Sequence, residues 1–138
     1  MSDAIYERMV KDLGKETKPV TYDVEKGHIK RFAEAIGDGN PLWLGVTVPP
    51  TFTRAFIPSD EDESQPRDPS ERVLDAGSDY EYFKAIKPGD QITVVSKIAE
   101  VFKKEGRLGT MTFQVKEISF TNQDGETVAT RRDTGIYY

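Results

Sequence analysis

A short loop between residues 36 and 43 holds the side chains that could most readily take part in chemistry. It contains one carboxylate, Asp38, and the only tryptophan of the chain, Trp43, and its sequence is IGDGNPLW. The glycines permit backbone angles that other residues avoid, and Pro41 restricts both its own φ and the preceding residue. We expect a stiff loop in which Asn40 bonds to the loop itself. Asp38 then either contacts a ligand or water, or caps the turn that begins at Gly37.

The composition excludes several other kinds of site. The 138 residues include no cysteine and a single histidine, His28, so thiolate nucleophiles and disulfides are excluded. No spaced carboxylate cluster suggests a metal site, and no cofactor is expected. The net charge of −5 argues against a nucleic-acid partner. The chain shows neither a membrane-spanning apolar run nor a signal-peptide pattern, so a cytoplasmic location is expected.

Apolar spacing predicts helices on the N-terminal side of the loop. The first covers residues 2–13, within an N-terminal region of residues 1–17, and a short strand is expected at 18–22. Asp23 can cap a second helix, in which Ile29, Phe32, Ala33 and Ile36 form one apolar stripe. His28 lies just before that stripe and is interpreted as a partly exposed residue on the helix.

A third, short helix is expected after the loop, at residues 51–57. Pro50 can open it, and its buried face would carry Phe52, Ala55 and Phe56. The free amides at its start could polarise a carbonyl or thioester, although a plain buried helix gives the same pattern. Residues 58–72 combine acidic residues with proline, and we expect them to form an acidic, mobile surface loop.

The C-terminal half predicts four strands, at residues 73–85, 91–102, 108–120 and 126–138. The turns between them are short, which favours an antiparallel meander. In the strand at 108–120 the apolar residues shift from odd to even positions, a parity change that suggests a bulge near Lys116 or Glu117. The early helices must cover one face of this sheet. The sequence therefore predicts a single α+β domain over residues 1–138, with the sheet wrapped around a shortened central helix. Pairing of edge strands in a dimer would protect the sheet edges.

The loop from Gly37 to Leu42 resembles the G-D-x-N-P-[LIV]-H loop of MaoC-like (R)-specific enoyl-thioester hydratases and dehydratases. The stretch from Val48 to Phe52 is similar to the start of the central helix in the N-terminal-type half of these enzymes. The turns at 88–90 and 122–125 also match, so the resemblance covers about residues 18–138. It implies a hot-dog fold, a CoA or carrier-protein thioester ligand, and addition of water to a trans-2-enoyl double bond by an Asp–His pair.

This chain departs from the family pattern at the histidine, which is replaced by Trp43. An indole N–H donates only and cannot accept a proton. The resemblance therefore implies a non-catalytic or weakly catalytic subunit of a heteromeric dehydratase, with lipid or fatty-acid substrates. Asp38 is the candidate catalytic residue. The candidate substrate-binding residues are Asn40, Trp43, Thr51, Phe52, Phe56 and Tyr82. Trp43 could equally be a core anchor.

Three functions stay open at this point. The first is a subunit that shapes the acyl-thioester pocket for a hot-dog partner carrying Asp and His, with a helix broken at Pro58 to admit a bulky or steroid-like chain. The second is a self-sufficient homodimeric hydratase, or a thioesterase, that uses Asp38. The third is a scaffold or binding module in an acyl-CoA complex of the thiolase type. Candidate contacts for CoA phosphates are Lys84, Lys87, Lys103, Lys104 and Arg107.

Overall fold

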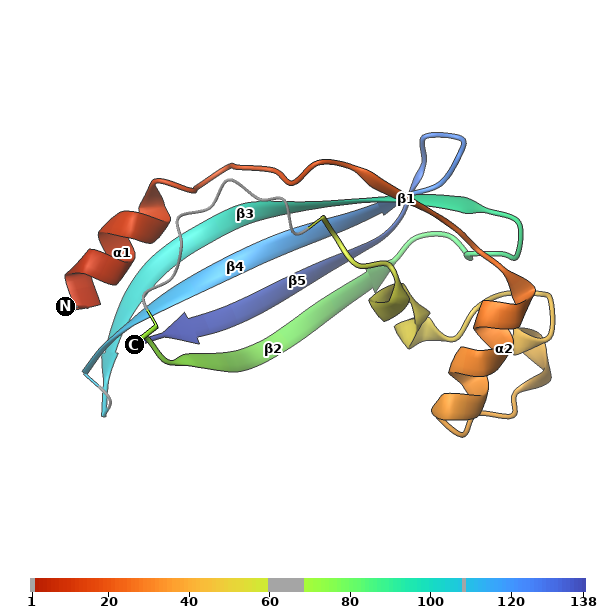
Figure 1. Cartoon of the computed structure of the whole chain (residues 1–138), viewed down its shortest axis with the longest axis horizontal. Helices are drawn as coiled ribbons and strands as arrows, with labels where there is room; N and C mark the ends of the chain where they lie inside the picture. Colours follow the sequence, from red (N-terminus) through yellow and green to blue (C-terminus); the bar gives the residue numbers. More distant parts are fainter. Residues whose placement is uncertain (1, 60–68, 108) are drawn as a thin grey trace.

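Five strands form one antiparallel sheet, with helical elements at its two ends (Figure 1). This computed structural model describes residues 2–59, 69–107 and 109–138, so most of the predicted acidic loop, residues 60–68, lies outside the described residues. The elements are α1 (Ser2–Val10), β1 (Val20–Asp23), α2 (Lys26–Ala35), the 3₁₀ helices η1 (Pro41–Trp43) and η2 (Pro50–Ala55), β2 (Val73–Tyr82), β3 (Gln91–Gly106), β4 (Gly109–Thr121) and β5 (Thr127–Tyr137). The expected α+β class is confirmed.

Three of the long strands form the expected meander, but β2 does not join it. The order across the sheet is β1-β3-β4-β5-β2, so β2 pairs with β5, from Tyr82 opposite Ala129 onward. The prediction that all four strands pair in sequence order is therefore wrong for β2. The turn after β2 crosses the end of the sheet instead, where the backbones of Gly89 and Asp90 bond to Val24. This leaves β1 and β2 as the two edge strands.

The predicted bulge lies on β3 rather than on β4. The register shifts between Ile98 and Glu100 of β3, whereas β4 keeps an uninterrupted register with β5 from Thr112 to Phe120. An extra residue on one strand of a pair bends that strand locally. The expectation of a bulge at Lys116 or Glu117 is thus corrected to the facing position on the neighbouring strand.

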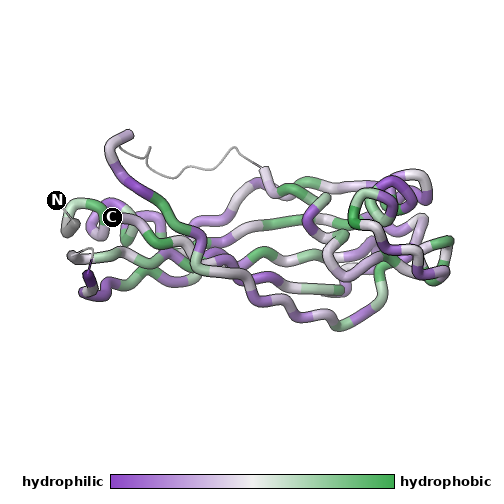
Figure 2. The backbone as a smooth tube through the Cα atoms, turned by 90° about the horizontal axis from the view of Figure 1, so that it is seen from below, coloured by the Kyte–Doolittle hydropathy of each residue, from purple (hydrophilic) through white to green (hydrophobic). Residues whose placement is uncertain are grey.

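The parity change in β4 has a different cause, because both faces of the sheet carry apolar side chains. Ile118 and Phe120 belong to the main core, and we call their side of the sheet the inner face. Phe113 points to the opposite, outer face, where its ring stacks on Phe102 at 4.9 Å between centroids. Figure 2 shows hydrophobic and hydrophilic residues alternating along the strands, as a pleated sheet requires.

The second helix begins later than the sequence indicates. Its N-cap is Glu25, which makes no side-chain capping bond, and the expected cap Asp23 is instead the last residue of β1. The Asp23 carboxylate accepts a hydrogen bond from the Gln91 side chain at 3.3 Å. Ile29 and Ala33 are buried as predicted, but Ile36 is 48% exposed because it forms the C-cap, where the helical period ends.

The expected central helix is a short 3₁₀ segment, η2, rather than an α-helix over 51–57. Pro49 and Pro50 carry no N–H, and the turns close through bonds such as Phe52 N to Pro49 O at 2.9 Å and Phe56 N to Thr53 O at 3.1 Å. Phe52 and Phe56 pack edge to face, with centroids 5.3 Å apart. Both are buried against the inner face of the sheet, together with Ile92, Val94, Ile118, Phe120, Val128 and Ala129. The core therefore sits at the end of the sheet that carries α2, η1 and η2 (Figure 1).

Candidate functional site

Asp38 is held in the turn that leads out of α2. Its carboxylate accepts the Asn40 N–H at 3.0 Å, and the Asn40 side chain accepts the Leu42 N–H at 3.0 Å, which caps η1. Gly37 adopts φ 71°, a left-handed conformation that favours glycine. Both polar side chains therefore shape the loop, as the sequence suggested for Asn40 and allowed for Asp38.

His28 does not complete an acid–base pair with Asp38. Its ring packs against the edge of Phe52, with centroids 5.0 Å apart, and the side chain is half-buried on α2. Within the part of the chain that the structure describes, no hydrogen bond joins His28 to Asp38. The two residues therefore offer no proton relay in this chain.

Trp43 lines a cavity of about 450 Å³, which we call the loop cavity. Its other lining residues are Thr47, Val48, Pro49, Pro50, Thr53, Tyr82, Phe83, Lys84, Ala85 and Ile86. Of the candidate substrate-binding residues, only Trp43 and Tyr82 lie here. The structure places Phe52 and Phe56 in the core. Asp38, Asn40 and Thr51 also lie outside this lining.

Two buried polar atoms at the loop cavity have no hydrogen-bond partner among the described residues. These are Trp43 Nε1 and Thr53 Oγ1, and the Thr53 residue is only 1% exposed. A buried donor without a partner costs about 1–3 kcal/mol. The indole N–H can only donate, so the group that would satisfy it must carry an acceptor, such as a carbonyl oxygen. Thr53 was not predicted, because a threonine in a short apolar helix carries no signal before its burial is known.

Tyr82 closes one side of the loop cavity. Its hydroxyl donates a hydrogen bond to the Pro50 carbonyl and so ties β2 to the start of η2. Burial raises the pKa of the Tyr82 hydroxyl. The neighbouring Thr53 hydroxyl, which does not meet hydrogen-bond geometry with it, offsets part of that rise. The hydroxyl therefore remains a protonated donor at neutral pH.

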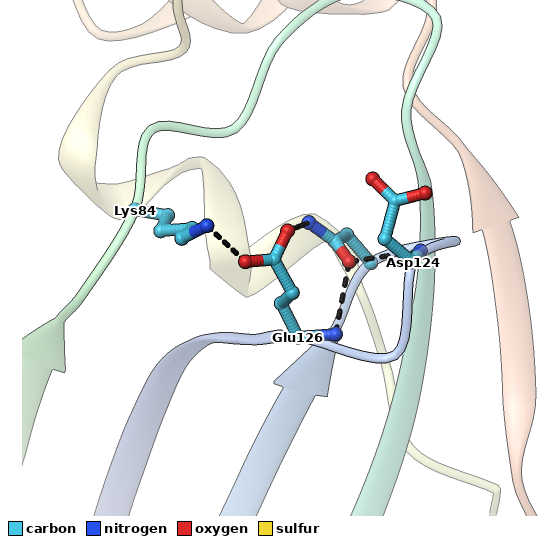
Figure 3. Close-up of polar contacts among 4 residues, drawn as sticks. Lys84, Asp124 and Glu126 are labelled. Carbon is cyan, nitrogen blue, oxygen red and sulfur yellow. Dashed lines mark hydrogen bonds and ion pairs between the residues drawn. The ribbon is translucent and has the colours of Figure 1, made fainter.

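Lys84 is fixed at the rim of the loop cavity by a polar cluster on the turn between β4 and β5 (Figure 3). Its ammonium pairs with the Glu126 carboxylate, and the Asn122 side chain donates to the other Glu126 oxygen at 3.4 Å. The Asn122 side chain also accepts the N–H groups of Asp124 and Glu126, at 3.0 and 3.1 Å. The bond from Lys84 is the main cause that lowers the pKa of Glu126. Among the candidate phosphate contacts, Lys84 alone lines this cavity.

Comparison with known proteins identifies the family. A family model described as FAS1-like, dehydratase domain region, matches residues 11–131. The chain belongs to this family. Dehydratase-region relatives include a UPF0336 protein from Parafrankia sp. (strain EAN1pec), which is 32% identical over 129 residues that cover 82% of this chain and 82% of the relative. A UPF0336 protein from Saccharopolyspora erythraea is 27% identical and covers 88% of this chain and 86% of the relative.

Solved structures share the fold of this dehydratase-region chain. The ChsH1–ChsH2 complex from Mycobacterium tuberculosis aligns with a TM-score of 0.78 at 20% identity, over 99% of this chain and 92% of that chain. The HadBC (3R-hydroxyacyl-ACP dehydratase) complex from the same organism aligns with a TM-score of 0.68 at 18% identity, over 91% and 96%. A MaoC-like dehydratase from Rhodospirillum rubrum aligns with a TM-score of 0.62 at 18% identity, over 90% of each chain. The predicted MaoC-like resemblance and hot-dog fold are confirmed.

The described ranges contain neither a metal-binding cluster nor a membrane-spanning helix. No group of three or more potential metal-ligating side chains is present among residues 2–59, 69–107 and 109–138. In the same ranges, no helix is long and apolar enough to cross a membrane.

Proposed function

We propose that this chain is the acyl-binding, non-catalytic subunit of a (3R)-specific enoyl-thioester hydratase. In this role it binds a CoA or carrier-protein thioester in the loop cavity. A partner chain with the same fold supplies the aspartate and histidine that add water to the double bond. The observation that carries the proposal is Trp43, which stands at the position of the family's histidine and lines the cavity.

The chemistry of Trp43 supports binding rather than catalysis. General acid–base catalysis needs a group that both accepts and donates a proton near neutral pH, and an indole N–H only donates. The buried Nε1 atom has no hydrogen-bond partner in the part of the chain that the structure describes. A thioester carbonyl oxygen would supply the missing acceptor, and the adjacent Thr53 hydroxyl could donate to the same oxygen.

The position of Asp38 argues against a self-sufficient enzyme. Its carboxylate serves the turn at Asn40 and does not line the loop cavity. A carboxylate that activates water must be within hydrogen-bond reach of that water beside the substrate. The geometry therefore favours the subunit role over a hydratase or thioesterase that relies on Asp38.

A two-chain assembly is supported by the fold and by the sheet edges. The ChsH1–ChsH2 and HadBC structures, both described as complexes, share this fold. In this chain β2 is an edge strand, and its exposed apolar residues include Val73 and Leu74. An edge strand leaves backbone groups free to pair with another chain, so we place the partner along β2.

The test compares the purified chain alone with the chain mixed with a dehydratase-fold partner that has an intact G-D-x-N-P-x-H loop. Calorimetry with octanoyl-CoA measures binding, and loss of the enoyl absorbance of trans-2-octenoyl-CoA measures hydration. We expect the chain alone to bind the thioester without turnover, and hydration to appear on mixing. Rapid hydration by the chain alone would overturn the subunit role. Absence of thioester binding to both the chain and the mixture would overturn the proposal altogether.

A further inference from the structure

A second cavity lies on the inner face of the sheet, beyond the end of η2. Its volume is about 280 Å³, and we call it the sheet cavity. It is lined by Arg54, Val73, Leu74, Asp75, Ser78, Gln114, Lys116, Asp133, Thr134, Gly135 and Tyr137. Lys116 lies on the same face of β4 as Ile118 and Phe120, because side chains two residues apart share a face. The inner face is thus apolar beneath η2 and polar where η2 no longer covers it.

A chain of hydrogen bonds fixes one wall of the sheet cavity. Arg131, which is 6% exposed, donates from Nε to Asp133 Oδ2 at 3.0 Å. The Ser78 hydroxyl donates to Asp133 Oδ1 at 2.7 Å and accepts a bond from the Arg54 guanidinium at 3.0 Å. The negative charge of Asp133 is therefore already balanced by Arg131, and both Asp133 oxygens are occupied.

Other hydrogen-bond donors at the sheet cavity have no acceptor or use only part of their bonding capacity. Lys116 is half-buried, and across the described residues its ammonium has neither an ion pair nor a hydrogen bond. Gln114 is 7% exposed; its carbonyl accepts from Tyr137 at 3.4 Å, while its amide nitrogen donates to no described residue. Arg54 bonds to Ser78 through only one of its nitrogens. The Lys116 ammonium and the Gln114 amide nitrogen, which have no acceptor among the described residues, indicate a site for an oxygen acceptor.

The loop cavity and the sheet cavity both lie along the inner face of β2. Tyr82 lines the loop cavity and Ser78 lines the sheet cavity, and four residues of strand span about 13 Å. Between them, the Tyr80 ring stacks on the Tyr82 ring with centroids 6.0 Å apart. On the opposite side, consecutive residues of η2, Thr53 and Arg54, line one cavity each. A thioester bound at Trp43 and Thr53 would therefore direct an extended acyl chain along the tyrosines toward Lys116.

We propose that the sheet cavity receives the far end of the acyl chain and selects thioesters that end in an oxygen acceptor, above all a carboxylate. This inference rests on the proposed function, since it assumes that the thioester occupies the loop cavity. An aliphatic chain end would bury against Lys116 and Gln114 without satisfying their donors, which is unfavourable. A terminal carboxylate satisfies Lys116, Gln114 and Arg54 together through charge-assisted hydrogen bonds.

The test measures the affinity of the full chain for dodecanoyl-CoA and dodecanedioyl-CoA by calorimetry, with 12-oxododecanoyl-CoA as an uncharged oxygen probe. We expect the dicarboxylic thioester to bind about tenfold tighter than dodecanoyl-CoA, the equivalent of one charge-assisted hydrogen bond. The oxo compound should lie between the two. Lys116→Met removes the donor but keeps an aliphatic side chain, so it should abolish most of the preference. Because the unsatisfied ammonium is gone, dodecanoyl-CoA should bind at least as tightly as it does to the wild type.

Lys97→Met is the matched control, because Lys97 is exposed and lies opposite Glu117 in the β3–β4 register, on the outer face. It removes the same charge and should retain the wild-type preference. Equal binding of all three thioesters, or a preference that survives Lys116→Met, would overturn this inference and leave the proposed function standing. Failure of every thioester to bind would overturn both.

Discussion

The Tyr82 hydroxyl donates a hydrogen bond to the Pro50 carbonyl oxygen, and this contact joins the end of β2 to the first turn of η2. Residues from these two elements form facing walls of the loop cavity. The η2 helix is only six residues long, begins at Pro50 and is preceded by Pro49. Such a short helix has few internal hydrogen bonds to hold it in place. The position of the cavity wall thus depends on tertiary contacts such as this one.

Replacing Tyr82 by phenylalanine tests that contact. Tyr82→Phe should lower the free energy of unfolding by about 0.5–1.5 kcal/mol, the usual net value of a hydrogen bond, and should weaken octanoyl-CoA binding because the cavity wall is less fixed. Urea unfolding and calorimetry measure the two effects. Tyr80→Phe is the control, since no hydrogen bond of the Tyr80 hydroxyl occurs among the described residues and its ring contacts persist. Equal effects of the two variants would contradict the role of the Pro50 contact.

Thr53→Val should separate stability from ligand binding. The Thr53 hydroxyl is buried and has no hydrogen-bond partner in residues 2–59, 69–107 and 109–138, so a valine of similar shape removes a desolvated polar group. We expect unfolding free energy to stay the same or rise by about 1 kcal/mol, while affinity for octanoyl-CoA falls. Thermal unfolding and calorimetry on one protein preparation report both. A stabilised variant with undiminished affinity would show that Thr53 does not contact the thioester.

Phe52 is the anchor that attaches η2 to the core. It is fully buried and contacts the rings of His28, Phe32 and Phe56 edge to face. Phe52→Ala should reduce unfolding free energy by about 3–5 kcal/mol, through lost burial and the cavity that remains. Leu44→Ala provides the comparison, because Leu44 is 76% exposed and should change stability by less than about 0.5 kcal/mol. Chemical denaturation measures both, and a small loss for Phe52→Ala would place the core elsewhere.

Asp90 connects two turns at the same end of the sheet. Its carboxylate accepts the Lys87 N–H at 2.9 Å and the Gln123 side-chain amide at 3.1 Å, and the residue is 8% exposed. Asp90→Ala leaves both donors unpaired and should cost about 1–3 kcal/mol. Asp124→Ala removes an exposed carboxylate that accepts no hydrogen bond from the described residues, and it should have little effect on urea unfolding. Similar losses in both variants would point to net charge rather than to the Asp90 bonds.

The Lys84–Glu126 pair predicts a change of stability in acid. The bond from Lys84 lowers the pKa of Glu126 below its ordinary value of 4.5. Because the folded-state pKa is the lower one, the stabilisation is fully present above pH 4.5 and is lost as the pH falls through the folded-state pKa. Glu126→Gln should therefore flatten this part of the stability–pH curve, measured by urea unfolding at several acid pH values. Glu81→Gln, on the exposed edge of β2, should retain the wild-type slope; a retained slope in Glu126→Gln as well would assign the acid dependence to other groups.

Local patterns in the sequence were sufficient for α2, for the long strands and for the family resemblance. The spacing of Ile29 and Ala33 identified the buried side of α2, and alternation identified the long strands, because these periods are properties of the chain itself. The loop from Gly37 to Leu42 combined glycine, proline and short polar side chains whose bonding is local, so the role of Asn40 was also predictable. The replacement of histidine by Trp43 was visible without any coordinates.

Only the tertiary structure decided which of these residues meet. Sequence order suggested that β2 would join the meander, but the pairing of Tyr82 with Ala129 places β2 beside β5, since strand order depends on contacts between distant segments. The same arrangement brings Trp43, Thr53 and Tyr82 to one cavity and leaves Asp38 outside it. The structure also identified Thr53 and Lys116 as candidate ligand contacts. Each lines a cavity, and the polar atom of each has no hydrogen-bond partner among the described residues.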